Sequence, residues 1–300
     1  MNRFLKIIFI AVFFSAFCVS DAKGIFKCGW MKKKIPAEIQ NRIPEDIDYI
    51  GRFDGTGTSV RLLKKTIMKE VSRYYFLQGV EFLDLRNRYY FFGSTTQGYC
   101  GILVQGKKKS AKRLFNNLVI QLKKKAPDTV VSKNYAVSKK EQLLFHLFTD
   151  DLLLISIDDI KLTRYQSRTP PPILKELNTS VLVSIYCKGD PRKIPGLRDY
   201  ISGIPVIPGF KEVRMVLKLV NLTLYFDFVF PTAGEAEKTS QQMDNILDKV
   251  AARHPKFPST FSKKLIKSTI HLALPRRFFK AAKTVLKDPE YQEVLHQHGF

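Results

Sequence analysis

Paired strands that run into an amphipathic helix occur twice in this sequence, and this repeated order is its strongest constraint on the fold. In the first half, β-branched and aromatic runs at 81–92 and 99–105 are separated by turn residues rich in Gly, Ser and Thr. They lead into a helix that Ser110 is expected to cap, with apolar residues three and four apart beyond it. Residues 142–157 then predict a β-hairpin. Its strands are apolar at nearly every position, so at least one is expected to be buried on both faces.

The second half repeats this order. Residues 211–220 and 223–230 predict a hairpin, and the second strand alternates apolar and polar residues, as a strand with one buried face does. Thr232 and Glu235 form a capping box at the start of the next helix. A last strand and a basic helix are expected over 269–287, because Pro275 separates two further periodic runs there.

These patterns predict an α+β protein in which helices pack on one face of antiparallel sheets, with two halves related as ferredoxin-like units. The three consecutive prolines at 170–172 cannot continue a helix or a central strand, so the domain boundary is expected there. The expected organisation is a signal peptide at 1–22, an irregular N-terminal arm at 23–45, a first α+β unit at 46–168, a second α+β unit at 173–287 and a C-terminal tail at 288–300.

A resemblance rests on three of these segments. They are the strand 102–106 leading into the Ser110 helix, the hairpin 148–156, and the strand 222–230 leading into Thr232. In these segments the chain resembles uncharacterised exported bacterial proteins built from tandem two-layer α+β, ferredoxin-like units. The resemblance implies a fold and a compartment, and it carries no catalytic residue to this sequence.

The first 22 residues have the composition of an export signal. A short positive start precedes residues 7–19, which carry no charge, and small residues follow at 20–22. Because this apolar stretch is too short to span a bilayer well, we expect cleavage after Ala22 and a periplasmic or secreted protein. A lipid anchor at Cys18 is not expected, since Phe17 stands where lipoprotein signals carry a small residue.

Three cysteines, Cys28, Cys100 and Cys187, would remain after cleavage. An odd number in an exported protein leaves one disulfide with one thiol as a possibility. Cys100 and Cys187 lie in strand-like runs, so small core residues are the other interpretation. The sequence leaves both open.

The charge of the chain is extreme. Its 50 Lys and Arg residues outnumber 27 Asp and Glu residues, for a formal net charge of +23. Such a balance favours an anionic polymer or membrane surface as partner. A composition rich in Lys, Phe, Ile and Tyr also follows from an A+T-rich genome, so the charge by itself does not establish a partner.

The distribution of charge is more informative than its sum. Residues 85–127 contain ten basic residues and no acid, and residues 249–287 contain eleven basic residues and no acid. In the first block, basic residues stand at both ends of the Ser110 helix, where they predict one basic face. The candidate anion-binding residues are Lys107, Lys108, Lys109, Lys112, Arg113, Lys123, Lys124, Lys125, Lys263, Lys264, Arg276 and Arg277.

Motifs for catalysis, metals or cofactors are not evident in the sequence. There is no Gly-x-Ser-x-Gly, and the histidines lack ligand spacing, with His146 inside an apolar strand and His271 without an acid nearby in sequence. The carboxylate pairs 150–151 and 158–159 fit turns or helix starts, with an acid/base pair as the alternative. We therefore expect a non-enzymatic binding or assembly module without a cofactor. The rival interpretation is an exported, hydrolase-like enzyme whose residues converge only in three dimensions.

Overall fold

The computed structural model describes residues 34–55, 87–157, 159–166, 169–181, 183–189, 209–218 and 223–285. The chain forms two compact units. Unit 1 comprises Met1–Ile185 with Ile194–Gly196, and unit 2 comprises Tyr186–Lys193 with Leu197–Phe300. This division lies later in the chain than the proline run at 170–172, where the sequence predicted a domain boundary. The predicted bounds of the two α+β units remain predictions. The predicted signal peptide and the tail at 288–300 lie outside the described residues.

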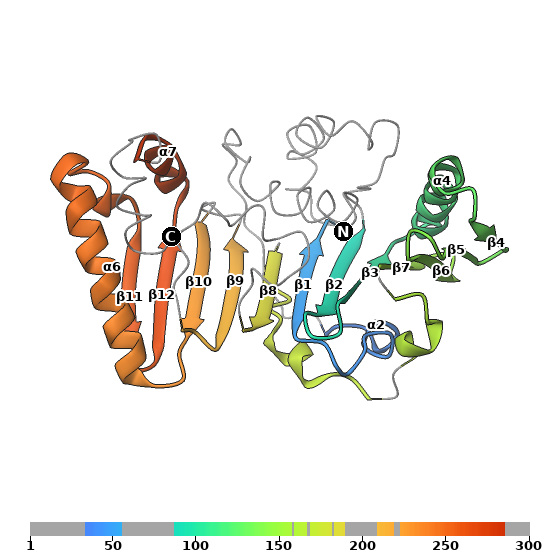
Figure 1. Cartoon of the computed structure of the whole chain (residues 1–300), viewed down its shortest axis with the longest axis horizontal. Coiled ribbons are helices and arrows are strands. Elements are labelled where there is room, and N and C mark those ends of the chain that lie inside the picture. The colour runs from blue at the N-terminus through green and yellow to red at the C-terminus, as the bar shows by residue number, and fades with distance from the viewer. Residues whose placement is uncertain are drawn as a thin grey trace. The chain divides into compact units, whose positions relative to one another are not determined.

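Unit 1 is an antiparallel sheet with helices (Figure 1). The order of its strands is β1-β2-β3-β7-β6-β5-β4. Its elements are α2 (Ala37–Gln40), β1 (Tyr49–Asp54), β2 (Arg88–Ser94), β3 (Tyr99–Gln105), α4 (Ser110–Lys125), β4 (Val130–Val131), β5 (Tyr135–Ser138), β6 (Leu143–Thr149), β7 (Leu152–Ile157) and the short 3-10 helices η1 (Leu162–Tyr165) and η2 (Pro172–Glu176). Strand β8 (Val183–Lys188) begins in unit 1 and ends in unit 2.

The core of unit 1 lies around β3 and β7. These strands pair antiparallel, with Ile102 opposite Ile155 and Val104 opposite Leu153. All six residues of β7 are buried, which confirms the prediction of a strand covered on both faces. Helix α4 packs on β6 and β7. It does so through the predicted apolar stripe, which is buried at Ala111, Leu114, Phe115, Leu118 and Leu122.

Unit 2 is a smaller sheet with the strand order β9-β10-β12-β11, and α6 packs on β11 and β12. Its elements are β9 (Glu212–Lys218), β10 (Thr223–Val229), α6 (Ala233–Arg253), the 3-10 helix η4 (Pro258–Thr260), β11 (Ser262–Ile266), β12 (Thr269–Leu274) and α7 (Arg276–Val285). The predicted capping box is present: Thr232 Oγ1 accepts from the Glu235 N–H at 3.2 Å, and the Glu235 carboxylate accepts from the Thr232 N–H.

The chain follows the same type of path in both units. In each, a strand leads through a helix to a strand that is not its neighbour, and the chain then returns to pair beside the first strand. In unit 1 this path is β3, α4, β4 and back through β5 and β6 to β7; in unit 2 it is β10, α6, β11 and back to β12. The antiparallel sheets with packed helices confirm the α+β class. In unit 1 three strands lie between β3 and β4, whereas in unit 2 one strand lies between β10 and β11, so the two units are not confirmed as a ferredoxin-like tandem.

The cap of α4 differs from the prediction. Ser110 is the first helical residue, and the preceding Lys109 has a left-handed backbone with φ of 62°. The Ser110 hydroxyl instead accepts from the Lys107 N–H at 3.1 Å and donates to the buried side chain of Asn87 at 2.7 Å. Ser110 therefore links the helix start to the residue that precedes β2, and the N–H groups of Lys109 and Lys112 are satisfied by Asp151 and Asp150.

Several elements carried too little local signal to be predicted. Strands β4 and β5 are short and β11 is basic, and α2 lies in the arm that was expected to be irregular. Cys100 and Cys187 are buried thiols, as small core residues would be. Within the described part of the chain, no helix has both the length and the apolar character needed to cross a membrane.

Gly93 provides a test of the packing in unit 1. A Cβ atom there would collide with the Tyr49 hydroxyl and with the backbone carbonyl of Tyr99, whereas a Cβ at Gly234 in α6 would meet nothing within 4 Å. We expect Gly93→Ala to destabilise unit 1 by about 1–3 kcal/mol, and Gly234→Ala to be neutral or stabilising by up to ~1 kcal/mol. Calorimetric unfolding of both variants checks this, and equal effects would contradict the packing described.

Candidate anion-binding surface

Two acids of the β6–β7 turn lie at the N-terminal end of α4. The turn between β6 and β7 places Asp150 Oδ1 3.0 Å from the Lys112 ammonium, and Asp150 Oδ2 lies 3.7 Å from that of Lys109. The hydrogen bond from Lys112, assisted by both positive charges, lowers the pKa of Asp150. Asp151 Oδ1 accepts from the Lys109 N–H at 2.8 Å, and the Asp150 carbonyl accepts from the Lys112 N–H at 3.1 Å. These two acids thus occupy the helix end that attracts anions.

The C-terminal end of α4 is organised differently, around Asp128. This carboxylate accepts from the Ser138 hydroxyl at 3.0 Å and from the Lys140 N–H at 3.1 Å. These bonds hold the turn between β5 and β6 next to the segment that leaves α4. The hydrogen bond from Lys140 is the main cause of a lowered pKa at Asp128, which therefore stays ionised at neutral pH.

Four exposed lysines gather at this end: Lys123 and Lys124 on α4, and Lys139 and Lys140 in the β5–β6 turn. We call them the open lysine cluster, because none of the four ammonium groups forms an ion pair with a residue that the structure describes. Two acids accompany them: Asp128, whose carboxylate accepts from Ser138 and from the Lys140 N–H, and Glu141, which follows Lys140 in the turn. Sequence reasoning missed Lys139 and Lys140, because they follow Asp128, at which the acid-free block ends.

The remaining predicted residues of unit 1 lie around the same helix. Lys107 and Lys108 are exposed in the loop between β3 and α4, where Lys108 has φ of 54°. Arg113 is exposed on the helix, and the side chain of Lys125 lies outside the description. The structure thus pairs Lys109 and Lys112 with Asp150, whereas Lys123 and Lys124 form no ion pair with a described residue.

In unit 2 the predicted residues do not share one role. The Lys263 ammonium lies 2.6 Å from Asp244 Oδ1 and donates to the Ser240 carbonyl at 2.8 Å, so it ties β11 to α6. Lys264 is exposed on β11, and Arg277 Nε donates to the Thr260 carbonyl at 3.4 Å. The side chain of Arg276 is not described. Lys263 is therefore mainly a structural residue.

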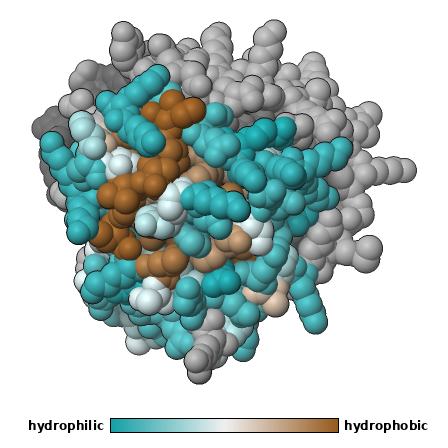
Figure 2. Space-filling model, turned by 90° about the vertical axis from the view of Figure 1, so that its right-hand side faces the viewer, coloured by the Kyte–Doolittle hydropathy of each residue, from teal (hydrophilic) through white to brown (hydrophobic). Residues whose placement is uncertain are grey.

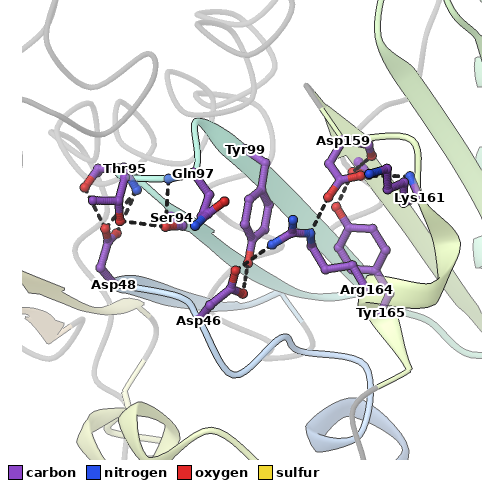
Figure 3. Close-up of polar contacts among 12 residues, drawn as sticks. Asp46, Asp48, Ser94, Thr95, Gln97, Tyr99, Asp159, Lys161, Arg164 and Tyr165 are labelled. Atoms are coloured by element: carbon purple, nitrogen blue, oxygen red, sulfur yellow. Dashed lines mark hydrogen bonds and ion pairs between the residues drawn. The ribbon is translucent and has the colours of Figure 1, made fainter.

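A second polar cluster in unit 1 surrounds Arg164 (Figure 3). Its guanidinium pairs with Asp159 and, at 2.5 Å, with Asp46, and it lies 4.5 Å from the centre of the Tyr99 ring. The Tyr99 hydroxyl donates to Asp46 at 2.7 Å. Burial, and then this hydrogen bond, raises the pKa of Tyr99, so its hydroxyl stays protonated at neutral pH. The cluster joins the loop before β1 to η1.

The same figure shows that Asp159 and Asp48 accept hydrogen bonds from neighbouring turns. Asp159 also accepts from the Lys161 N–H at 2.8 Å, and Asp48 accepts from the N–H and hydroxyl of Thr95 at 2.8 and 2.6 Å (Figure 3). Asp158 lies outside the description. With Asp150 and Asp151 at the start of α4, the described members of both predicted pairs hold turns and a helix end. Among the described residues, no group of three or more His, Cys, Asp or Glu side chains is placed to hold a metal ion.

Two histidines find partners that sequence spacing did not indicate. His271 Nδ1 lies 2.7 Å from Asp227 Oδ1, because β10 and β12 place these residues opposite each other. The His146 ring stands edge-on to Phe148, 4.6 Å between centroids, and the Arg42 guanidinium lies 4.2 Å from the centre of the Phe148 ring. Burial, and then the positive charge of Arg42, lowers the pKa of His146.

With this geometry in hand, the chain was compared with known proteins. No family model matches it, and no curated protein matches it either. It is similar to the crystal structure of TP0453, a Treponema protein, with a TM-score of 0.51 at 10% identity over 83% of this chain and 97% of that chain in crystal form III. Crystal form I gives a TM-score of 0.49 at 9% identity, over 85% and 99%.

The likeness is one of fold. At this identity it supports the arrangement of strands and helices and assigns no residue a role. It agrees with the predicted α+β class. The candidate surface therefore rests on the residues of this chain alone.

The position of His146 yields a pH prediction. Because its folded-state pKa lies below the ordinary value of 6.5, the unfolded chain binds the proton more readily, and stability should fall as pH drops below about 6.5. NMR titration of the His146 ring should give a pKa under 6.5 in the wild type. In Arg42→Met the pKa should move only part of the way back, since burial remains. A pKa at or above 6.5 in the wild type would contradict this environment.

Proposed function

We propose that this chain is an exported, non-enzymatic binding protein that holds an anionic envelope polymer through the open lysine cluster. The observation that carries the proposal is the contrast between the two ends of α4. Lys109 and Lys112 already face Asp150, whereas Lys123 and Lys124 are joined by Lys139 and Lys140 without an ion pair among described residues. Exposed ammonium groups without an internal ion pair remain available to an external polyanion.

A purely structural explanation accounts for only half of the cluster. Lysines in the last turn of a helix interact favourably with the negative end of its dipole, which explains Lys123 and Lys124. Lys139 and Lys140 belong to no helix and lie in the turn between β5 and β6. Asp128 and Ser138 nevertheless hold that turn beside the helix end. The convergence of two separate lysine pairs is what an anion-binding surface requires.

Charge reversal tests the proposal directly. The double variant Lys123→Glu/Lys124→Glu should elute from heparin at lower salt than the wild type, with a slope of log affinity against log salt smaller by roughly 2. The matched control is Lys238→Glu/Lys256→Glu, which makes the same charge change at exposed positions of unit 2. Equal losses in both variants would mean that only net charge matters, and salt-independent retention of the wild type would contradict the proposal.

Removal of an internal acid should have the opposite effect. Asp150→Asn frees Lys109 and Lys112, while the backbone carbonyl that accepts from the Lys112 N–H remains. We expect tighter heparin binding, by a few-fold at low salt, because two ammonium groups join the surface. Titration calorimetry of wild type and Asp150→Asn measures this. Unchanged binding in a folded Asp150→Asn variant would show that this end of α4 takes no part.

A further inference from the structure

An apolar strip lies on one face of the strands next to the open lysine cluster. Val130 on β4 is 56% exposed and Tyr135 on β5 is 38% exposed. The register places Val130 opposite Val137 and Tyr135 opposite His146, and Tyr135 and Val137 are two residues apart on one strand, so these side chains share a face. Figure 2 shows apolar residues gathered in a band on this side of the protein, bordered by hydrophilic ones.

The strip has lysines at both of its ends. Lys133 is exposed in the turn before Tyr135, and Lys139 and Lys140 are exposed directly after the other end of β5. A strand of four residues is about 13 Å long, so these positive charges bracket a short apolar track. Opposite Tyr135 on β6 lies His146, whose ring stands edge-on to Phe148, and the Arg42 guanidinium lies over the Phe148 ring.

Resting on the proposed function, we infer that the anionic polymer is a polysaccharide, which lays a sugar ring on Tyr135 while its acidic groups meet Lys133, Lys139 and Lys140. One face of a sugar ring carries C–H groups, which favour the negative face of an aromatic ring and aliphatic side chains such as Val130 and Val137. The hydroxyl rim of the sugar stays in water. An apolar track between positive charges matches such a chain, in which apolar ring faces and acidic groups alternate.

Two other occupants fit these residues less well. A second copy of this chain, related by a two-fold axis, would place the lysines at one strip end against those at the other, and like charges would oppose each other. Single-stranded nucleic acid is bound by successive aromatic platforms, whereas Tyr135 is flanked on its strip by two valines. The positive ends and the single tyrosine therefore favour a charged polysaccharide.

The test compares two polyanions, of which only the first contains sugar rings. Binding of the full chain to a polyuronate and to long-chain polyphosphate is measured by calorimetry at one fixed salt concentration. Tyr135→Ser should weaken polyuronate binding about tenfold and leave polyphosphate binding unchanged, since loss of one stacking contact has roughly this effect. Tyr135→Phe should keep the wild-type affinity. Leu265→Ser, at a 39% exposed apolar position of β11, is the matched control and should change neither.

The outcomes separate this inference from the proposed function. If both polymers bind and Tyr135→Ser weakens both equally or neither, the polysaccharide assignment is overturned while the polyanion function stands. If neither polymer binds, both fall. The assignment is also overturned if Tyr135→Ser lowers the affinity for single-stranded DNA or anionic vesicles more than the affinity for polyuronate. It is overturned as well if the wild type sediments as a dimer that Tyr135→Ser dissociates. As a readout independent of any variant, the Tyr135 ring resonances of the wild type should shift on addition of polyuronate and stay in place with polyphosphate.

Discussion

The antiparallel pairing of β7 with β3 is the interaction on which unit 1 depends. It buries the apolar strand at the centre of the sheet, with Ile155 opposite Ile102. It also brings the β6–β7 turn to the start of α4, where Gly106 donates to the Asp151 carbonyl at 2.8 Å. Because that turn carries Asp150 and Asp151, one strand pairing fixes the core and the charge at the helix N-terminus together. The same return of the chain beside the strand before the helix recurs in unit 2.

The geometry of unit 1 determines which basic residues of α4 are available to an external anion. A uniformly basic helix face would bind anions along its whole length. Instead, its N-terminal lysines face Asp150, and its C-terminal lysines are joined by those of the β5–β6 turn. Because ion pairs within the protein compete with ligands for the same ammonium groups, the open end is where an external anion gains most. The apolar strip beside it adds a contact that does not depend on charge.

Local patterns predicted much of the fold. Strands β3 and β12 have the bounds that hydrophobic runs indicated, and the Thr232 capping box stands where its four-residue signature placed it. Such features depend on residues only a few positions apart, so they can be predicted from a single sequence. Ser110 shows the limit, because its hydroxyl is used by Asn87 and the helix start is satisfied by residues some forty positions away. The pairing of His271 with Asp227 likewise follows only from strand register.

The sequence by itself determined the α+β class, the hairpins, the amphipathic faces of α4 and α6, and the presence of two acid-free basic blocks. Those properties follow from local periodicity and composition. Only the tertiary structure decided which lysines are already paired, that Lys139 and Lys140 join Lys123 and Lys124, and that Tyr135 and Val130 share an exposed strip. The physical reason is that ion pairing and surface contiguity depend on distances of a few ångströms between residues far apart along the chain, and strand register sets those distances.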